Sequence, residues 1–335
     1  MTGPLDRLTP DERAQLRPAR AGFVAPMLAT LTEERFSDPA WVYERKLDGV
    51  RVVAARDGRG AHLWSRSQQP LDDTYPELVD AVAAQVAPGT VLDGEIVAFD
   101  GGRTSFERLQ GRSGLHDRRA ALASGIPVFL YAFDVPVVDG HDVTALPLRT
   151  RKRLLRVAVR TGDPLRVAQH RNADGEAYLR EACARGWEGL IAKRADAPYR
   201  VGRRSPDWLK LKCLHAQELV IGGWTDPEGS RTGFGALLVG YHEDGRLRYA
   251  GKVGTGFDRR VLDDLGARMR RLDTAEAPFA DPVRARGVHW VRPELVAQIG
   301  FSEWTRDGRL RHPRYLGLRE DKAPEDVVRE EASSR

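Results

Sequence analysis

The chain has 335 residues, of which 41% are hydrophobic and 30% charged, as is typical of a globular protein long enough for two domains with separate cores. Its net charge of +5 favours a polyanionic partner such as nucleic acid. The two cysteines, Cys183 and Cys213, are too few for a disulfide framework or a four-cysteine zinc site, and they indicate a reducing, cytoplasmic setting. The sequence has no long apolar run, so neither secretion nor a membrane segment is predicted.

The first part of the chain alternates between strand and helix patterns. Residues 1–22 are charged and aperiodic, and we expect them to form a mobile leader. Residues 41–45 have a strand pattern, and residues 50–55 are expected to return as the second strand of a hairpin that turns at Asp48 and Gly49. A third strand is expected at 62–66, and a helix follows near 75–82. This mixture predicts an α+β fold.

Two acidic residues lie in the next strand pattern. Residues 90–99 alternate tightly enough for a buried strand, yet they contain Asp93 and Glu95, which are two residues apart and therefore on one face. Two carboxylates on one face favour a cation or a ribose as their partner, although Asp93 could equally orient a neighbouring turn. The apolar run 128–135 predicts a central strand, and its pattern alone favours core packing for Phe133.

Basic residues are prominent in the following segments. Residues 148–160 have a helical, arginine-rich pattern, which is more typical of a solvated helix face than of a DNA groove. Strands are expected at 188–193, which begins with Glu188, and at 202–212. In the second of these, Lys210 and Lys212 lie on the same face.

The pattern changes near residues 213–217, where we expect a hinge. Short strands interrupted by one amphipathic helix then follow over roughly 100 residues, as in a small OB-type barrel. The charged residues from 321 onward are expected to fray. The predicted organisation is therefore a leader (1–22), a first domain (23–215), an OB-fold domain (216–320) and a charged tail (321–335).

Lysine is rare in this chain, which has 7 lysines and 46 arginines. A guanidinium keeps its proton, whereas an ammonium can lose one and become a nucleophile, so each lysine is informative. Lys46 lies at the end of a predicted strand. A Lys-x-Asp-Gly tetrapeptide alone is more typical of a solvated hairpin turn than of a catalytic site.

Taken together, these residues suggest a site for a nucleoside triphosphate and a divalent metal. Attack of the Lys46 amine on the α-phosphorus would give a lysine–nucleotide phosphoramidate and pyrophosphate. Free lysine has a pKa near 10.4, so only about one molecule in a thousand to ten thousand is reactive at neutral pH. We expect Lys210, Lys212 and a metal to lower this pKa by like-charge repulsion and to neutralise charge on the α-phosphate.

The motifs also occur in a recognisable order. They read ERKLDGVR from residue 44, SR at 65–66, LDGEIVAFD from 92, FDV at 133–135, EGLIAK from 188, WLKLK from 208 and LRHPRYLGLREDK from 310. In this order they resemble the ATP-dependent DNA ligases of the covalent nucleotidyltransferase superfamily, and especially the ligase modules of bacterial non-homologous end-joining enzymes. The resemblance runs from Phe23 to Lys322. It implies an adenylation domain with mixed and antiparallel sheets, followed by an OB-fold domain.

The resemblance implies a role for each matching residue. Lys46 would be adenylylated, and Lys210 with Lys212 would act on the α-phosphate. Glu188 and Glu95 would hold the metal. The implied nucleotide contacts are Glu44 to the adenine amino group, Arg51 to ribose or phosphate, Arg66 to AMP and later to the 5′-phosphate at the nick, Glu95 to ribose, Phe133 stacked on adenine, and Lys193 and Arg204, with Arg203 as an alternative to the last.

Two residues of the OB-fold domain, Arg311 and Asp321, match family positions that are used during enzyme adenylylation. The implied cofactors are ATP and Mg2+ or Mn2+, and the implied substrate is nicked or broken duplex DNA, sealed through lysine–AMP and 5′-adenylated DNA during repair and end joining. A Ku-type end-binding protein is the expected partner. A monomer in the cytoplasm, associated with the nucleoid, is expected.

Two alternatives remain open. An RNA ligase or a GTP-using capping enzyme would share Lys46, Glu95, Glu188 and the paired lysines. A non-catalytic OB-fold nucleic-acid binder would carry an inactive nucleotide site. Glu44 ahead of the lysine and the ending RHPRYLGLREDK favour a DNA ligase. NAD is disfavoured as the nucleotide donor because a zinc-binding cysteine set is missing.

Overall fold

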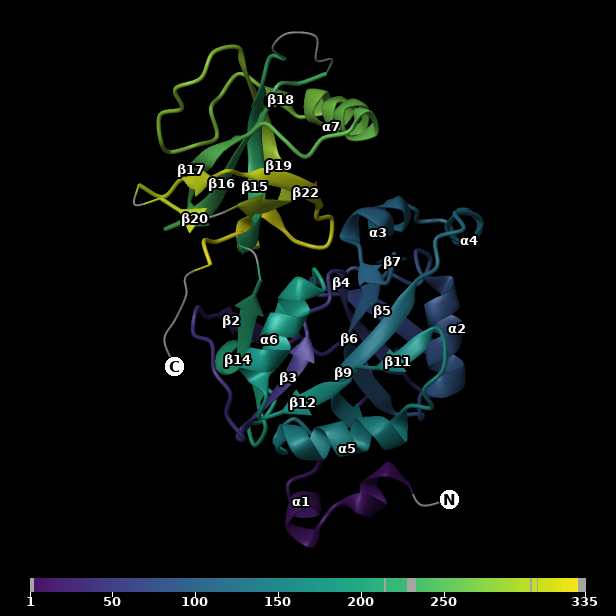
Figure 1. The fold of residues 1–335 in the computed structure, drawn as a ribbon. Helices are drawn as coiled ribbons and strands as arrows, with labels where there is room; N and C mark the ends of the chain where they lie inside the picture. Colours follow the sequence, from purple (N-terminus) through teal and green to yellow (C-terminus); the bar gives the residue numbers. More distant parts are fainter. Residues whose placement is uncertain (1–2, 214, 228–232, 302, 306, 331–335) are drawn as a thin grey trace. The chain divides into compact units, whose positions relative to one another are not determined.

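The computed structural model describes residues 3–213, 215–227, 233–301, 303–305 and 307–330. It divides into two compact units, the first ending at Cys213 and the second running to Glu330, as Figure 1 shows. Leu214, which lies within the expected hinge at 213–217, is outside the described residues. Each unit has its own buried apolar core.

The first unit is built on two sheets. The larger is seven-stranded and antiparallel apart from one parallel pairing between β11 and β9. In spatial order its strands are β1 (Arg17–Pro18), β10 (His141–Asp142), β9 (Phe129–Val138), β6 (Thr90–Val97), β4 (Val50–Arg56) and β5 (Ala61–Ser65), with β11 (Leu165–Val167) beside β9. The smaller is five-stranded, in the order β12 (His170–Asn172), β3 (Trp41–Arg45), β13 (Gly189–Arg194), β14 (Arg204–Lys212) and β2 (Leu28–Leu31).

Helices cover both sheets (Figure 1). Leu8, Val82 and Leu155 lie in the large core, and α5 packs against β9 while α6 packs against β3 and β13. The helices and remaining short strands of this unit are η1 (Pro4–Arg7), α1 (Pro10–Ala14), α2 (Pro76–Gln85), β7 (Phe99–Asp100), β8 (Arg103–Thr104), α3 (Phe106–Ser113), α4 (Arg118–Ala123), α5 (Leu148–Ala158) and α6 (Gly175–Ala184). The α+β prediction is confirmed, and most predicted strands match within a few residues.

The segment around Lys46 differs from the prediction. β3 belongs to the small sheet and β4 to the large one, so the expected hairpin is wrong and residues 46–49 cross between the two sheets. A Cβ atom at Gly49 would lie 2.1 Å from the carbonyl oxygen of Ile96, so only glycine fits at this crossing. The Lys46 N–H donates to the Gly189 carbonyl at 2.9 Å. Lys46 therefore lies at the junction of the sheets.

The expected mobile leader is also wrong for residues 3–22. Thr9 and Glu12 form a capping box at the start of α1, and the Leu8 side chain is buried in the large core. The Thr150 hydroxyl on α5 donates to Glu12 at 2.6 Å, and Arg17 pairs with Asp142 of β10. The charged composition masked this capping signal.

The cysteines differ from the expected reduced state. Cys183 and Cys213 are joined by a disulfide, which connects the last turn of α6 to the residue after β14. A single bridge is consistent with the prediction that the chain has no disulfide framework. The prediction that both cysteines are reduced is wrong. The Cys213 N–H also donates to the Glu188 carbonyl at 2.9 Å.

The second unit is a six-stranded antiparallel sheet with one long helix. α7 packs Leu265 and Met269 into its core. Its elements are β15 (His215–Thr225), β16 (Leu237–Glu243), β17 (Arg246–Val253), α7 (Arg259–Arg271), β18 (Asp273–Thr274), β19 (Val288–Phe301), β20 (Glu303–Trp304), β21 (Leu310–Arg311), β22 (Arg314–Leu318) and η2 (Pro324–Asp326).

The expected frayed tail is ordered up to residue 330. Val327 is fully buried, and its carbonyl accepts a hydrogen bond from the His242 N–H at 2.7 Å. The Gln217 side chain donates to the Val328 carbonyl at 2.8 Å. The buried Val327 side chain and the carbonyls of Val327 and Val328 therefore anchor this segment, while residues 331–335 are outside the described part. Among the described helices, none has the length and apolar character needed to cross a bilayer.

Candidate functional site

The Lys46 side chain contacts a carboxylate from the neighbouring strand segment at the same end of the small sheet. Tyr43 of β3 lies in the core with residues of α6. Because side chains alternate along a strand, Glu44 and Lys46 point to the opposite face of the sheet from Tyr43. Glu188 directly precedes β13, which pairs with β3, and its Oε2 atom lies 2.6 Å from the Lys46 Nζ atom. Neither side chain is fully buried, so the pair lies where a ligand can reach it.

The pKa of Lys46 is shifted in the direction opposite to the expected one. Burial by itself lowers the pKa of an ammonium, but attraction to Glu188, with smaller contributions from Glu95 and Asp48, raises the pKa of Lys46 above its ordinary value. The expectation that nearby lysines lower this pKa is therefore wrong for the protein without nucleotide. The nearest charges are acidic, and Lys46 is held as an ammonium.

This electrostatic setting predicts a strong pH dependence of nucleophilic attack. Because an ammonium whose pKa is at or above its ordinary value near 10.4 leaves little free amine near neutrality, the rate of attack by Lys46 should rise about tenfold per pH unit from about pH 6 to about pH 9, whether or not Glu188 stays in contact. The measurement is single-turnover labelling with saturating radiolabelled ATP. A flat profile over this range would show that loss of the Lys46 proton does not limit the reaction.

Arg51 is fixed in position by a buried acid. Its Nε and Nη2 atoms lie 2.5 and 2.6 Å from the two carboxylate oxygens of Asp93. The Tyr199 hydroxyl donates to the same carboxylate at 2.7 Å and accepts from the Met27 N–H at 3.0 Å. Asp93 is fully buried, so its role is to orient Arg51. Burial lowers the pKa of the Arg51 guanidinium, but Asp93 outweighs burial and raises this pKa above its ordinary value, with a smaller contribution from Glu95, which pairs in register with Arg51.

An aromatic group connects Arg51 to Lys193. The Phe133 ring centre lies 4.6 Å from the Arg51 guanidinium carbon and 4.2 Å from the Lys193 Nζ atom. Trp208 meets Phe133 edge to face at 6.1 Å and lies 4.0 Å from the same ammonium. Phe133 is only half-buried, unlike the core residue that the pattern alone favoured.

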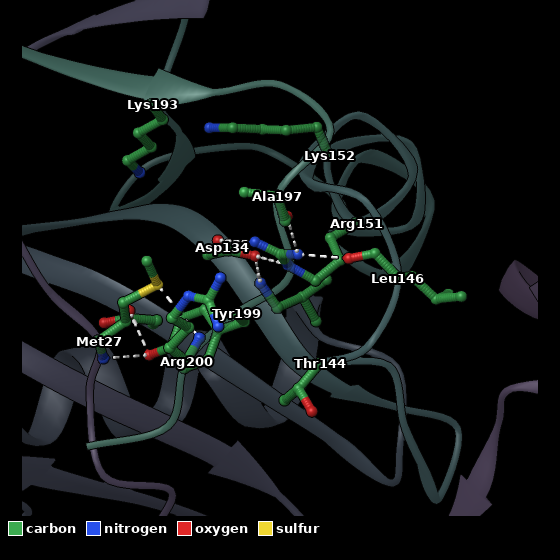
Figure 2. A network of polar contacts seen from close by, with 12 residues as sticks. Met27, Asp134, Thr144, Leu146, Arg151, Lys152, Lys193, Ala197, Tyr199 and Arg200 are labelled. Carbon is green, nitrogen blue, oxygen red and sulfur yellow. Dashed lines mark hydrogen bonds and ion pairs between the residues drawn. The ribbon is translucent and has the colours of Figure 1, made fainter. Parts of the chain in front are cut away.

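Glu44 is enclosed by two lysines. The Lys193 Nζ atom lies 2.9 Å from Glu44 Oε2, and the Lys152 ammonium contacts Glu44 Oε1. Burial opposes ionisation of Glu44, but both lysines outweigh it and lower the pKa of this carboxyl. Figure 2 shows Lys152 extending from its helix toward Lys193, beside the pair formed by Asp134 and Arg151.

The paired lysines lie on β14 next to this cluster. Lys210 pairs in register with Ile191, and Lys212 pairs with Gly189, the residue after Glu188. Arg66 directly follows β5 and is half-buried. At the start of β14, Arg204 is exposed and its guanidinium donates to the Ala29 carbonyl. The Arg203 carbonyl accepts from the Leu28 N–H, and the choice between the two arginines stays a prediction.

The last two predicted residues lie in the second unit. Arg311 is exposed and pairs in register with Glu303, at the end of β21. Asp321 accepts two hydrogen bonds from Arg319, at 2.9 and 2.8 Å. The structure therefore connects Arg51, Phe133, Lys193 and Glu44 through direct contacts, pairs Lys46 with Glu188, and places Arg311 and Asp321 in a separate unit.

The acidic residues suit a metal only together with a polyphosphate. Within the described ranges, no group of three or more His, Cys, Asp or Glu side chains is arranged to hold an ion. Mg2+ commonly takes one or two protein carboxylates and completes its shell with phosphates and water. Glu188 and Glu95, which both act on Lys46, fit that pattern.

Several residues that organise this site were missed from the sequence. Tyr199 and Lys152 hold Asp93 and Glu44, and Trp208 supports Phe133 and Lys193. The scarcity of lysine was a usable signal for Lys152. Trp208 begins the WLKLK motif, but the motif assigns it no role. Tyr199 had no sequence signal, because its role depends on contacts between distant segments.

Comparisons with known proteins agree with this arrangement. The family model described as "ATP dependent DNA ligase domain" matches residues 26–212, and that described as "ATP dependent DNA ligase C terminal region" matches residues 230–322. The solved structure titled "mycobacterial DNA ligase D complexed with ATP and MES" is 36% identical, with a TM-score of 0.65, and the match covers 92% of this chain and 98% of that one.

Curated relatives point the same way. "Multifunctional non-homologous end joining DNA repair protein LigD" of Mycobacterium tuberculosis (strain ATCC 25618 / H37Rv) is 40% identical over 316 residues, 92% of this chain and 40% of the relative. "Multifunctional non-homologous end joining protein LigD" of Pseudomonas aeruginosa is 37% identical over 333 residues, 94% of this chain and 39% of the relative. The match thus spans less than half the length of either relative. With a nucleotidyltransferase unit followed by an OB-fold unit, the chain belongs to the ATP-dependent DNA ligase family.

Proposed function

We propose that this chain seals nicks in duplex DNA by transferring AMP from ATP to Lys46 and then to the 5′-phosphate at the nick. In the first step a nitrogen–phosphorus bond forms at Lys46, the bond from the α-phosphorus to its bridging oxygen breaks, pyrophosphate leaves and the amine loses one proton to water. In the second step an oxygen of the 5′-phosphate attacks the AMP phosphorus, the nitrogen–phosphorus bond to Lys46 breaks and the amine takes up a proton. In the third step the 3′-hydroxyl loses its proton, bonds to the 5′-phosphate and displaces AMP. The 2.6 Å contact between Lys46 and Glu188 carries this proposal, and the contacts of the Phe133 ring with Arg51 and Lys193 support it.

The basic side chains have separate tasks in the first step. Lys210 and Lys212 neutralise charge that builds on the α-phosphate oxygens. Arg51 contacts ribose or phosphate, and because Asp93 already holds its guanidinium in place, nucleotide binding costs little further side-chain entropy at Arg51. Glu188 and Glu95 are the residues that would hold Mg2+ or Mn2+, which supplies further charge neutralisation at the phosphates. Glu188 is also the partner that holds Lys46 as an ammonium, so an ion held by Glu188 would weaken that contact.

Adenine lies against the Phe133 ring, with its amino group at Glu44. The half-buried state of Phe133 supports this placement, since a stacking face needs to be reachable. Glu44 is kept ionised by its two lysines, and a carboxylate accepts hydrogen bonds but cannot donate them. Arg66 contacts AMP and then the 5′-phosphate, and Lys193 and Arg204 complete the nucleotide contacts.

We infer that the sealing serves DNA repair by end joining. The LigD relatives, whose names carry that process, support this inference, although this chain matches only 40% of the Mycobacterium tuberculosis protein. A Ku-type end-binding protein is the proposed partner. A cytoplasmic monomer associated with the nucleoid is the proposed state.

One experiment tests the proposed reaction against its alternatives. The protein is incubated with α-labelled ATP, GTP or NAD in turn, and any adduct is then offered nicked DNA, nicked RNA or a diphosphate-ended RNA. We expect an adduct from ATP alone and transfer of its label to nicked DNA. An adduct from GTP would favour a capping enzyme, transfer only to RNA would favour an RNA ligase, and no adduct would favour a non-catalytic binder.

Arg311 is proposed to act only in the first step, through the pyrophosphate of ATP. Replacing Arg311 by alanine should lower the rate of adduct formation by about a hundredfold, the loss typical of one cation that orients a leaving group. Sealing of DNA that already carries a 5′-adenylate should stay near normal, because it has no pyrophosphate to orient. Arg292→Ala, at an exposed arginine of the same unit, is the matched control and should leave both rates unchanged. Equal loss of both steps in Arg311→Ala would assign Arg311 to structure or DNA binding.

A further inference from the structure

Lys152 lies in an environment that the sequence did not predict. It belongs to the arginine-rich helix α5, whose basic residues were expected to face solvent, which is wrong for two of them. Leu148, Arg151, Lys152 and Leu155 recur at helical spacing and are all buried. The Lys152 and Glu44 side chains are each only 4% exposed, and their charged groups are in contact. The helix α5, which packs on the large sheet, thus supplies the Lys152 ammonium to Glu44 of the small sheet.

The charges around Glu44 do not balance locally. Lys152 and Lys193 both contact this one carboxylate, one at each oxygen. The next buried acid, Asp134, is already bound through both oxygens by Arg151, at 2.8 and 3.0 Å. Burying an extra ammonium costs free energy, and apolar residues of similar volume often replace buried ion pairs without loss of stability. Stability alone therefore does not account for a second lysine here.

We propose that Lys152 is a positioning residue that, with Lys193, fixes the Glu44 carboxylate so that it selects adenine over guanine. This inference rests on the proposed contact between Glu44 and the base. Each carboxylate oxygen has a second lone pair left after its lysine is bound. Fixed in this way, Glu44 accepts a hydrogen bond from the 6-amino group of adenine and repels the carbonyl oxygen that guanine carries at that position.

The pKa values of Lys193 and His170 are lowered in the direction that an excess of positive charge around Glu44 would cause. Burial, assisted by repulsion from Lys152, lowers the pKa of Lys193 to about 8 although Glu44 opposes this shift. Burial and Lys152 likewise lower the pKa of His170 to about 4, so this ring is neutral near pH 7. The residual charge at Lys193 lies against the Phe133 ring, 4.2 Å from its centre, where the base is proposed to stack.

The test replaces Lys152 by methionine, which keeps the length of the side chain and removes the charge. Adduct formation is measured over a range of ATP and GTP concentrations. We expect the KM for ATP to rise at least about tenfold, because Glu44 is left without one of its two partners. We expect kcat to change less than KM and the ratio of ATP to GTP use to fall. If the methionine variant does not fold, adduct formation with ATP and GTP is measured in Lys152→Gln instead, which removes the charge but keeps a hydrogen-bond donor near Glu44.

Two controls separate positioning from structural damage. Arg112→Met breaks another buried ion pair of the same unit, with Glu77 at 2.8 Å, and should lower stability without changing the ratio of ATP to GTP use. In a Glu44→Gln background, Lys152→Met should add little to the change in that ratio, because Lys152 acts through Glu44.

The outcomes are distinguishable. An unchanged KM and ratio in both Lys152 variants, or an equal change of the ratio in Arg112→Met, would overturn the role of Lys152. Full additivity of the Glu44 and Lys152 changes would also overturn it. Failure of the unaltered protein to form an adduct with ATP would instead overturn the proposed function.

Discussion

Replacing Lys46 by arginine is expected to abolish the ATP adduct while leaving the fold intact. A guanidinium preserves the positive charge and can still pair with Glu188, which lies 2.6 Å from Nζ in the native protein. It stays protonated at every accessible pH and so has no lone pair for the α-phosphorus. Labelling with α-labelled ATP should fall below detection, a loss of at least about a thousandfold if Lys46 is the nucleophile.

Lys252→Arg makes the same chemical change at an exposed position of β17 and should leave labelling unchanged. Thermal unfolding of both variants should match that of the unaltered protein within a few degrees. Labelled Lys46→Arg protein, with the label mapped to another residue, would overturn the assignment of Lys46.

The largest loss of stability is expected from Asp134→Asn. Asp134 and Arg151 are both 0% exposed and joined through both oxygens, and Arg151 also donates to the carbonyls of Leu146 and Ala197, as Figure 2 shows. The change leaves a buried guanidinium without its counter-charge. The free energy of unfolding of the Asp134→Asn protein, measured by urea denaturation, should be about 3–5 kcal/mol lower than that of the unaltered protein.

The matched control is Asp80→Asn, which removes the acid from an exposed pair with Arg118 whose side chains are 67% and 52% exposed. Solvent screens that pair, so the loss should stay below about 1 kcal/mol. Similar losses in the two variants would mean that the buried pair contributes no more than a surface one.

Local patterns were enough to predict the strands but not their partners. Alternation located β3 and β4 within a residue, because burial of one strand face depends on nearby residues. The hairpin between them was wrong, because the Asp-Gly pair at 48–49 has the local pattern of a turn. The pairing of Glu44 with Ile191 and of Arg51 with Glu95 determines the actual arrangement, and such distant contacts leave no short-range pattern.

The sequence predicts a set of site residues but not the electrostatic arrangement of those residues. Glu188 was expected to serve a metal, and its 2.6 Å contact with Lys46 was not foreseen, so the direction of the Lys46 pKa shift was wrong. Charge signs along a sequence do not show which groups approach most closely. The same reason explains why Lys152 was overlooked within an arginine-rich helix.

The packing of the first residues matters to anyone who shortens this protein for expression or crystallisation. Glu12 contacts α5 on its outer side through Thr150, at 2.6 Å, and through Arg153, at 3.0 Å, while Lys152 of the same helix meets Glu44 on the inner side. A truncated chain that starts at residue 23 would remove Leu8 from the core and expose the helix that supports Glu44. A shorter chain would therefore lose the packing of Leu8 and the contacts of Glu12, and weakened nucleotide binding in such a chain would reflect that loss rather than a defect in the ligase chemistry.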